Sequence, residues 1–524
     1  MPKSPETKKG IAGHILRTML TTGMAYVLNF GITLGLAPYI TKTVGTAAYG
    51  FITLSKQFAQ YATILTTALN TYAARYIGIE YHRDNNEQAR VYAASVFWGD
   101  FALASAILAL SGILIFSLEY VMNVPAQLVS DVKLLFLLVF LGFFVTTTCS
   151  VFGCTGYVVN RTDLTGIFKT LSYLVNGLVM IVLFRAFPPK VFYVGAGTLA
   201  AALVIGGSDF WITKRYLPHL SFSRRYFSFS AIKRLVVDGF WASFSMIGDL
   251  LNNGLDLLVC NQMLTSVAMG QISIAKTMHM VVQSLYMIVD QAFFPRFLRC
   301  YAKDEKGALI RELKISMKVS GLLTNLVFAG FVALGMAYYR LWIPGEDTRL
   351  IYELTVITIS TCISTGAIHP LYYIYTLTLK KKVPCIVTIV GGFFNVAGMY
   401  ILIRYYGMGA HAVVWTTTVV MAVINFVTNP LYMAHVLHIP YGTFYPDVLK
   451  NTLACGVLTA VFCGLSRIWM PDSWPGLVLC IVLYSLIGTP LHVLLVCTRE
   501  QRQGLISIIK AKPHDSASAD QEEN

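Results

Sequence analysis

Long apolar stretches separated by short polar breaks run along the chain from about His14 to Val496. A helix needs roughly 20 apolar residues to cross the hydrocarbon core of a bilayer, and about fourteen stretches meet that requirement. The predicted spans cover residues 15–41, 47–74, 91–117, 133–158, 164–185, 191–213, 236–261, 267–294, 316–339, 350–377, 383–405, 409–434, 446–466 and 474–496. The pattern therefore predicts an all-α integral membrane protein, because it leaves no room for a large soluble domain.

Composition and net charge support a membrane protein. Hydrophobic residues make up 56% of the 524 residues and charged residues only 13%, which is more apolar than a soluble chain of this length could bury. The net charge of +14 would suggest nucleic acid in a soluble protein, but Lys and Arg in a membrane protein first mark cytoplasmic connections. Basic residues concentrate at the N-terminus and in alternate connections, within residues 75–90, 214–234, 296–314 and 380–382. We therefore expect both termini to be cytoplasmic, the basic connections to contact anionic membrane lipids, and no nucleic acid to bind.

The chain repeats itself at an offset of 220 residues. Residues 46–56 (TAAYGFITLSK) align with residues 266–276 (SVAMGQISIAK). The identical pairs are Ala48 with Ala268, Gly50 with Gly270, Ile52 with Ile272 and Lys56 with Lys276. A duplicated unit with an even number of spans inserts both copies in the same orientation, as in transporters whose two bundles rock around a shared cleft.

The repeat predicts the domain organisation. Residues 1–215 and 232–436 are expected to form two six-helix bundles, joined by a basic cytoplasmic linker at residues 216–231. Residues 437–498 supply two additional spans. Residues 499–524 are a cytoplasmic tail whose end is rich in Ser, Asp and Glu and is expected to be disordered. Alternating access to a cleft between the two bundles makes transport the expected function.

Basic side chains inside the spans are candidates for the transport site, because each costs about 2.5–3.5 kcal/mol to insert and usually faces a wet cavity or a partner. Lys56 and Lys276 occupy equivalent repeat positions, roughly 15 Å from the outer ends of their helices, and are predicted to bind an anion. Arg75 and Arg296 either form a basic rim that recruits phosphate or snorkel to the headgroups, as we also expect for Lys318. The predicted substrate-binding set is Lys56, Lys276, Arg75, Arg296, Asn29 and Asn253.

Carboxylates inside the spans are candidates for ion coupling, since a buried carboxylate can bind a proton or cation reversibly. In span seven, helical spacing places Asp249 and Asp256 on one stripe with an asparagine between them. The predicted ion-coupling set is Asp249, Asp256, Asp290 and Asp100. The alternative is that Asp249 or Asp256 only neutralises Lys276 as a structural ion pair.

Two repeated bundles, two additional spans and the segment at residues 36–40 (LAPYI) followed by residues 44–50 (VGTAAYG) form a recognisable pattern. The chain resembles the bacterial polysaccharide flippases, the O-antigen and capsule repeat-unit exporters of the multidrug/oligosaccharidyl-lipid/polysaccharide superfamily. The resemblance implies a V-shaped pair of bundles in the bacterial cell (inner) membrane that moves a polyprenyl-pyrophosphate-linked oligosaccharide to the outer leaflet. It also implies proton or cation coupling and polysaccharide-assembly enzymes as partners. On this interpretation Lys56 and Lys276 attract the pyrophosphate or acidic sugars.

Two other functions stay open. A drug or cation antiporter of the same superfamily would share the bundles, although such antiporters typically have twelve helices. A membrane glycosyltransferase or polymerase usually needs a sizeable outer loop with acidic residues, whereas the outer connections here are short. The ten cysteines show no metal-ligand spacing, and no catalytic constellation stands out. We therefore expect a transporter with no cofactor or metal rather than an enzyme.

Overall fold

The protein is described by a computed structural model that covers residues 8–159, 161–378, 380–499 and 501–502. Every regular element within these ranges is a helix, so the prediction of an all-α fold is confirmed. The disorder predicted for the end of the tail, after Lys512, concerns residues that lie outside the described ranges.

Fourteen helical rods in the described chain coincide with the fourteen predicted spans. They are α1 (Lys8–Thr43), α2 (Thr46–Asn70), α4 (Asn86–Phe116), α6 (Val129–Thr148) with α7 (Ser150–Val158), α8 (Thr162–Ala186), α9 (Phe192–Tyr216), α10 (Phe229–Asp249) with η3 (Leu250–Gly254) and α11 (Asp256–Met263), α12 (Ser266–Ala302), α13 (Lys306–Trp342), α14 (Thr348–Ile359) with α15 (Thr361–Ile368), η4 (His369–Tyr372) and α16 (Tyr373–Leu377), α17 (Lys382–Arg404), α18 (Ala410–Val423) with η5 (Ile424–Thr428) and α19 (Asn429–Leu437), α20 (Tyr445–Ile468) and α21 (Trp474–Val496). The short elements are α3 (Ala73–His82), α5 (Leu118–Val121), η1 (Ala126–Leu128) and η2 (Arg224–Tyr226). Ten helices within the described ranges are long and apolar enough to cross a membrane, and the chain is a multi-pass membrane protein.

The chain divides into two compact units. Unit 1 comprises Met1–Ile274 with Lys382–Val413, and unit 2 comprises Ala275–Lys381 with Val414–Asn524. The boundaries of these units differ from those of the two predicted repeat bundles. The bundles and the V-shaped cavity between them therefore stay predictions. Each unit is considered by itself below.

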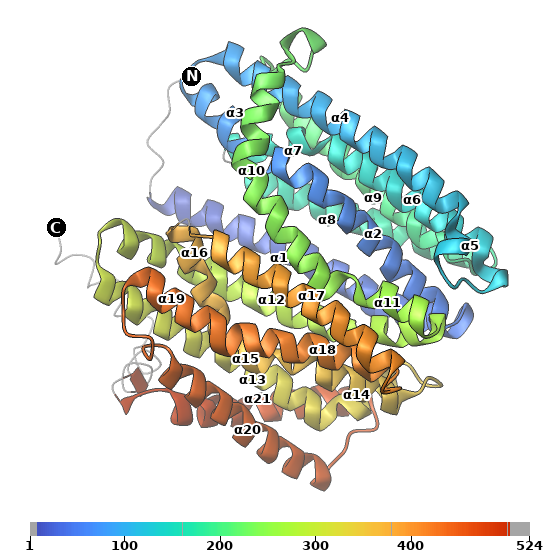
Figure 1. The fold of residues 1–524 in the computed structure, drawn as a ribbon, viewed down its shortest axis with the longest axis vertical. Helices are drawn as coiled ribbons and strands as arrows, with labels where there is room; N and C mark the ends of the chain where they lie inside the picture. The colour runs from blue at the N-terminus through green and yellow to red at the C-terminus, as the bar shows by residue number, and fades with distance from the viewer. Residues whose placement is uncertain (1–7, 160, 379, 500, 503–524) are drawn as a thin grey trace. The chain divides into compact units, whose positions relative to one another are not determined.

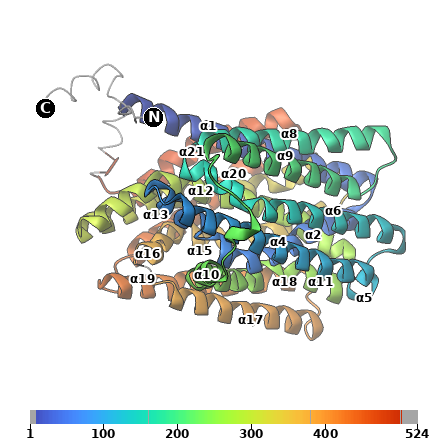
Figure 2. The ribbon, with the colours of Figure 1, turned by 90° about the horizontal axis from the view of Figure 1, so that it is seen from above.

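In unit 1, helices from both predicted bundles pack together. Helix α9 lies between α6 and α8, α1 packs on α8, and α10 packs on both α2 and α17 (Figures 1 and 2). A cluster of buried side chains from α2, α3, α4 and α7 fills the interior near the connection between α9 and α10. This cluster fixes α3, α4 and α7 as neighbours.

Two glycines matched by the repeat contact each other in unit 1. A Cβ atom on Gly270 would lie 2.1 Å from the carbonyl oxygen of Thr46, and one on Gly50 would lie 2.9 Å from the backbone nitrogen of Gly270. Only hydrogen fits at such distances, so the absent side chains allow α2 and α12 to cross in backbone contact. The contact thus joins two positions that the repeat matches.

We therefore expect Gly270→Ala to destabilise the protein by roughly 1–3 kcal/mol, because the methyl group cannot fit without moving backbone. Thermal unfolding of the detergent-purified protein measures this effect. Gly112→Ala is the matched control, because a Cβ on Gly112 would meet nothing within 4 Å. Equal melting temperatures for the two variants would show that α2 and α12 do not cross at this point.

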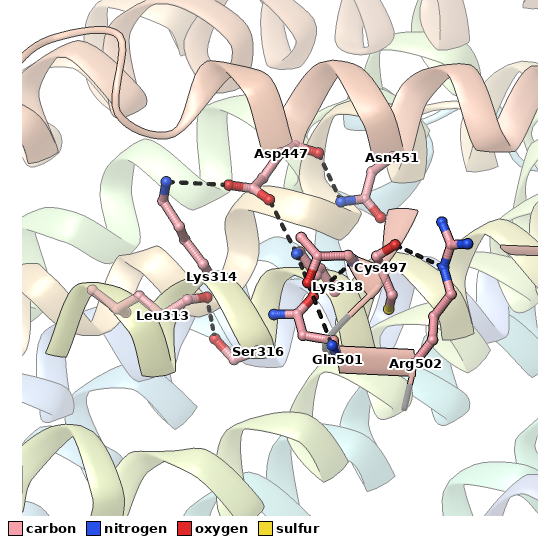
Figure 3. Close-up of polar contacts among 10 residues, drawn as sticks. Leu313, Lys314, Ser316, Lys318, Asp447, Asn451, Cys497, Gln501 and Arg502 are labelled. Carbon is pink, nitrogen blue, oxygen red and sulfur yellow. Dashed lines mark hydrogen bonds and ion pairs between the residues drawn. The ribbon is translucent and has the colours of Figure 1, made fainter. Parts of the chain in front are cut away.

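In unit 2, the two additional helices α20 and α21 pack on α13, and a buried charge cluster joins them (Figure 3). The Lys318 side chain on α13 is 8% exposed, and its Nζ atom lies 3.6 Å from Oδ1 of Asp447 on α20. Lys314 Nζ lies 3.5 Å from the other carboxylate oxygen. Lys318 Nζ also donates a hydrogen bond of 2.8 Å to Oε1 of Gln501. The expectation that Lys318 snorkels to the headgroups is therefore wrong, because α20 and residues that follow α21 supply its partners inside the protein.

The residues after α21 are also fixed to the helix end. Arg502 donates hydrogen bonds from Nη2 to the carbonyl oxygen of Leu494 at 2.7 Å and from Nε to that of Cys497 at 3.0 Å. A guanidinium at this position satisfies carbonyl groups that lack partners at a helix C-terminus. Asn325 of α13 adds a contact to α20, donating to the carbonyl oxygen of Asn451 at 2.9 Å.

Candidate functional site

Three of the described membrane helices contain a π-helical or 3₁₀ segment in their interior. A π-helix, η3, separates α10 from α11, and a second π-helix, η5, separates α18 from α19. A 3₁₀ segment, η4, follows α15. Interrupted helices in membrane transporters frequently carry the substrate or ion site, because the irregular turn frees polar backbone groups. The segment η3 is the one that contains predicted site residues.

Asn252 occupies the centre of η3 and is 1% exposed. Its Nδ2 atom donates to the carbonyl oxygens of Gly248 at 2.8 Å and of Thr388 on α17 at 2.7 Å. The Asn252 Oδ1 atom is buried without a hydrogen-bond partner. A buried acceptor without a donor costs free energy, so this oxygen is available to a bound cation or a proton carrier.

Neighbouring helices stabilise the irregular turn. Asn395 on α17 donates to the carbonyl oxygen of Asn252 at 2.9 Å. The hydroxyl of Tyr61 on α2 donates to the carbonyl oxygen of Gly254. Side chains from α2 and α17 thus satisfy carbonyl groups at the π-turn, and the segment keeps a fixed geometry in the protein interior.

The predicted stripe of span seven is not continuous, because η3 changes the helical register between its members. Asp249, the last residue of α10, is exposed, whereas Asn252 and Asp256 are buried. Asp256 is 4% exposed, and its Oδ1 atom accepts a hydrogen bond of 3.2 Å from the backbone nitrogen of Leu257. Asn253 is half-buried. Of the two predicted ion-coupling residues in span seven, Asp256 is therefore buried and Asp249 is not, and their role stays a prediction.

Asp100 on α4 forms a second buried polar cluster in unit 1. It has no exposed surface, and Asn70 Nδ2 donates to its Oδ1 atom at 2.9 Å. The Ser150 hydroxyl lies 2.6 Å from Asp100 Oδ2 and 3.0 Å from Asn70 Oδ1. Two neutral partners donate to both carboxylate oxygens, which stabilises an ionised carboxylate in the protein interior. Sequence reasoning missed Ser150, which lies 50 residues away in the chain and belongs to no motif.

The remaining predicted site residues differ in their surroundings. Lys56 is exposed and Lys276 is half-buried. They belong to different units, and their joint role stays a prediction. Asn29 is half-buried on α1. The side chain of Asp290 lies outside the part of the structure that is described.

The two matched arginines of the predicted basic rim have different environments. Nη1 of Arg296 lies 3.7 Å from Glu312 Oε2 on α13. Arg75 is exposed on α3 and lines a cavity of about 640 Å³ together with His82 and Arg83. Among the described residues, no group of three or more His, Cys, Asp or Glu side chains could hold a metal ion.

One known protein is similar to this chain in sequence, and solved structures are similar to it in fold. The chain is 28% identical over 479 residues to the "Uncharacterized membrane protein EpsK" of Bacillus subtilis (strain 168), and the match covers 91% of this chain and 95% of that protein. The structure of "Lipid II flippase MurJ, inward closed conformation" is similar with a TM-score of 0.64 at 15% identity, covering 91% of this chain and 98% of that one. An inward-facing multidrug resistance MATE family transporter of the MOP superfamily is similar with a TM-score of 0.58 at 14% identity, covering 81% and 98%.

The helices define a multi-pass membrane protein with the fold of these two transporter structures. The chain belongs to the polysaccharide biosynthesis protein family, whose sequence model matches residues 15–300.

Proposed function

We propose that this protein is a flippase that moves a polyprenyl-pyrophosphate-linked oligosaccharide from the cytoplasmic to the outer leaflet of a bacterial cell membrane. The match of residues 15–300 to a polysaccharide biosynthesis family carries the proposal. Its membrane helices are suited to moving an amphiphile across a bilayer by alternating access. Both termini are proposed to be cytoplasmic, and assembly enzymes of the same pathway are proposed partners.

The additional helices favour a lipid-linked substrate over a small cation. The lipid II flippase structure aligns with 91% of this chain, whereas the drug transporter structure aligns with 81%. Helix α20 is fixed to α13 through the buried Lys318–Asp447 pair, and α21 also packs on α13, so both helices form part of unit 2. A small-molecule antiporter is the second candidate, supported by the fold similarity and by the buried carboxylates.

We propose that Asp256 with Asn252, and separately Asp100, bind the coupling proton or cation. Each carboxylate is buried inside a membrane helix, where its charge is costly without a partner. Reversible neutralisation removes that cost and can bias one conformation over the other, which is the requirement for coupling transport to an ion gradient. The unpartnered Asn252 Oδ1 atom supports η3 as the cation site.

Lys56 and Lys276 are proposed to attract the pyrophosphate of the substrate. We expect Lys56→Gln and Lys276→Gln each to lower the rate of lipid-linked oligosaccharide transfer by about tenfold or more, because a hydrogen bond to a charged group contributes about 1.5–3 kcal/mol. Proteoliposomes with a labelled lipid-linked oligosaccharide measure the rate. Lys42→Gln, an exposed lysine at the end of α1, is the matched control. Rates for the two variants equal to that of the control would exclude both lysines from the site.

A further inference from the structure

Two adjoining pockets lie on α3 and its neighbours in unit 1, and the second shares Asn70 and Ser150 with the Asp100 cluster. The first, which we call the arginine pocket, has a volume of about 640 Å³ and is lined by Arg75 and His82 of α3, by Arg83 directly after α3, and by the end of α7. The second, the polar pocket, has a volume of about 750 Å³ and is lined by Asn70, Ser150, Lys169 and Asp209 among others. Ala74 and Tyr157 line both pockets, so the two are continuous.

The position of α3 brings the basic side chains to one face. His82 follows Arg75 by seven positions, which puts both on one side of α3 about 10 Å apart, and Arg83 is the C-cap residue of the same helix. Helix α3 packs against α4 and α7, and Nε2 of His82 lies 3.1 Å from the carbonyl oxygen of Val158 at the end of α7. This contact holds the wall of the arginine pocket against α7.

The two arginines of the arginine pocket form no ion pair with the described residues. Nearby Arg161, in contrast, lies 3.1 Å from Asp163, a hydrogen bond that raises the pKa of its guanidinium. Guanidinium groups bind phosphoryl oxygens in bidentate fashion, so two such groups lining one pocket suit a diphosphate.

The polar pocket offers the groups that bind sugar hydroxyls. Asp209 and Asn70 supply acceptors, Lys169 supplies a donor, and Ser150 is hydrogen-bonded to the buried Asp100. Asp209 is 9% exposed, and its carboxylate lies against Gly153, where a Cβ would be 3.2 Å from Oδ2. Tyr157 is 72% exposed between the two pockets and presents an aromatic ring to a bound group.

We propose that the arginine pocket binds the pyrophosphate of the lipid-linked substrate and that the polar pocket binds the sugar attached to it. The two pockets then form a loading site within unit 1, formed by residues near the cytoplasmic ends of α2, α3 and α7. This inference rests on the proposed flippase function and names where its substrate is first recognised. A phospholipid headgroup also carries phosphate, but it has one phosphoryl group where the pocket has two arginines, and it lacks the sugar.

The test is equilibrium binding to the detergent-purified full chain with three probes. The probes are farnesyl-pyrophosphoryl-N-acetylglucosamine, farnesyl pyrophosphate and phosphatidylglycerol. The double variant Arg75→Gln/Arg83→Gln is expected to lose about tenfold or more in affinity for both pyrophosphates, because two charge-assisted contacts are removed. Lys169→Gln is expected to weaken only the probe that carries the sugar, and Ala74→Phe, which fills the shared wall, is expected to weaken both pyrophosphates.

The double variant Arg215→Gln/Arg224→Gln changes the same charge at exposed positions outside both pockets and is the matched control. The proposal would be overturned if Arg75→Gln/Arg83→Gln lost no more affinity for the pyrophosphates than this control does. It would also be overturned if phosphatidylglycerol bound as tightly as the pyrophosphates. Thermal unfolding of each variant shows whether a loss of affinity results from misfolding. If the double arginine variant misfolds, Lys169→Gln provides an independent test. If the wild type transfers the lipid-linked glycan without needing the pockets, the loading site fails and the flippase function stands. If the wild type binds the pyrophosphates through the pockets but transfers no lipid-linked glycan, the loading site stands and the flippase function fails.

Discussion

Asp447→Ala is expected to destabilise unit 2 by about 3–5 kcal/mol, because removing one partner of a buried ion pair leaves the other charge uncompensated. The charge left behind is Lys318, of which 8% is exposed. Two buried thiols report this loss, since Cys455 on α20 and Cys480 on α21 are 2% and 1% exposed. Their reaction with a fluorescent maleimide during heating measures the melting temperature of this part of unit 2.

Two further variants separate the ion pair from general damage. Asp472→Ala removes an exposed carboxylate from the connection between α20 and α21 and is expected to leave the melting temperature nearly unchanged. The double variant Asp447→Ala/Lys318→Met should recover much of the lost stability, because replacing a buried pair by apolar groups is often neutral. A double variant as unstable as Asp447→Ala alone would show that the uncompensated lysine is not the cause.

Asp256→Asn is expected to abolish the response of transport to an imposed proton or sodium gradient and to lower gradient-driven transfer at least about tenfold. The physical reason is that a neutral amide cannot exchange charge with the gradient, whereas a buried carboxylate can. Asp249→Asn is the control from the same span, because Asp249 is exposed before the π-turn while Asp256 is buried after it. The measurement is lipid-linked oligosaccharide transfer in proteoliposomes with and without a gradient. Equal effects of the two substitutions would contradict the assignment of the site to η3.

The positions of the membrane helices could be predicted from the sequence because they depend on the length of apolar segments, which is a local property. The fourteen predicted spans coincide with helical rods. The repeat also identified Gly50 and Gly270, which contact each other in the structure. Their contact could not be predicted from spacing, because it depends on how two distant helices cross.

The candidate site was less predictable. A regular helix places Asp249, Asn252 and Asp256 on one stripe, but η3 is a π-helix, and the spacing of residues does not encode that change of register. Lys318 looked like a snorkelling residue because its partner Asp447 lies on a helix far along the chain. The same applies to Asp100, whose partner Ser150 comes from another helix. Polar partners inside membrane proteins are set by tertiary packing, which single-sequence patterns do not contain.

The most direct test of the flippase function is transfer by the wild-type protein in proteoliposomes. The lipid-linked oligosaccharide carries a fluorophore on its glycan, and a membrane-impermeant reductant destroys the label in the outer leaflet. We expect faster exposure of label than in protein-free vesicles, and a further increase when a proton or sodium gradient is imposed. Exposure at the protein-free rate, together with gradient-driven efflux of ethidium from the same preparation, would contradict the flippase function and identify a small-cation antiporter.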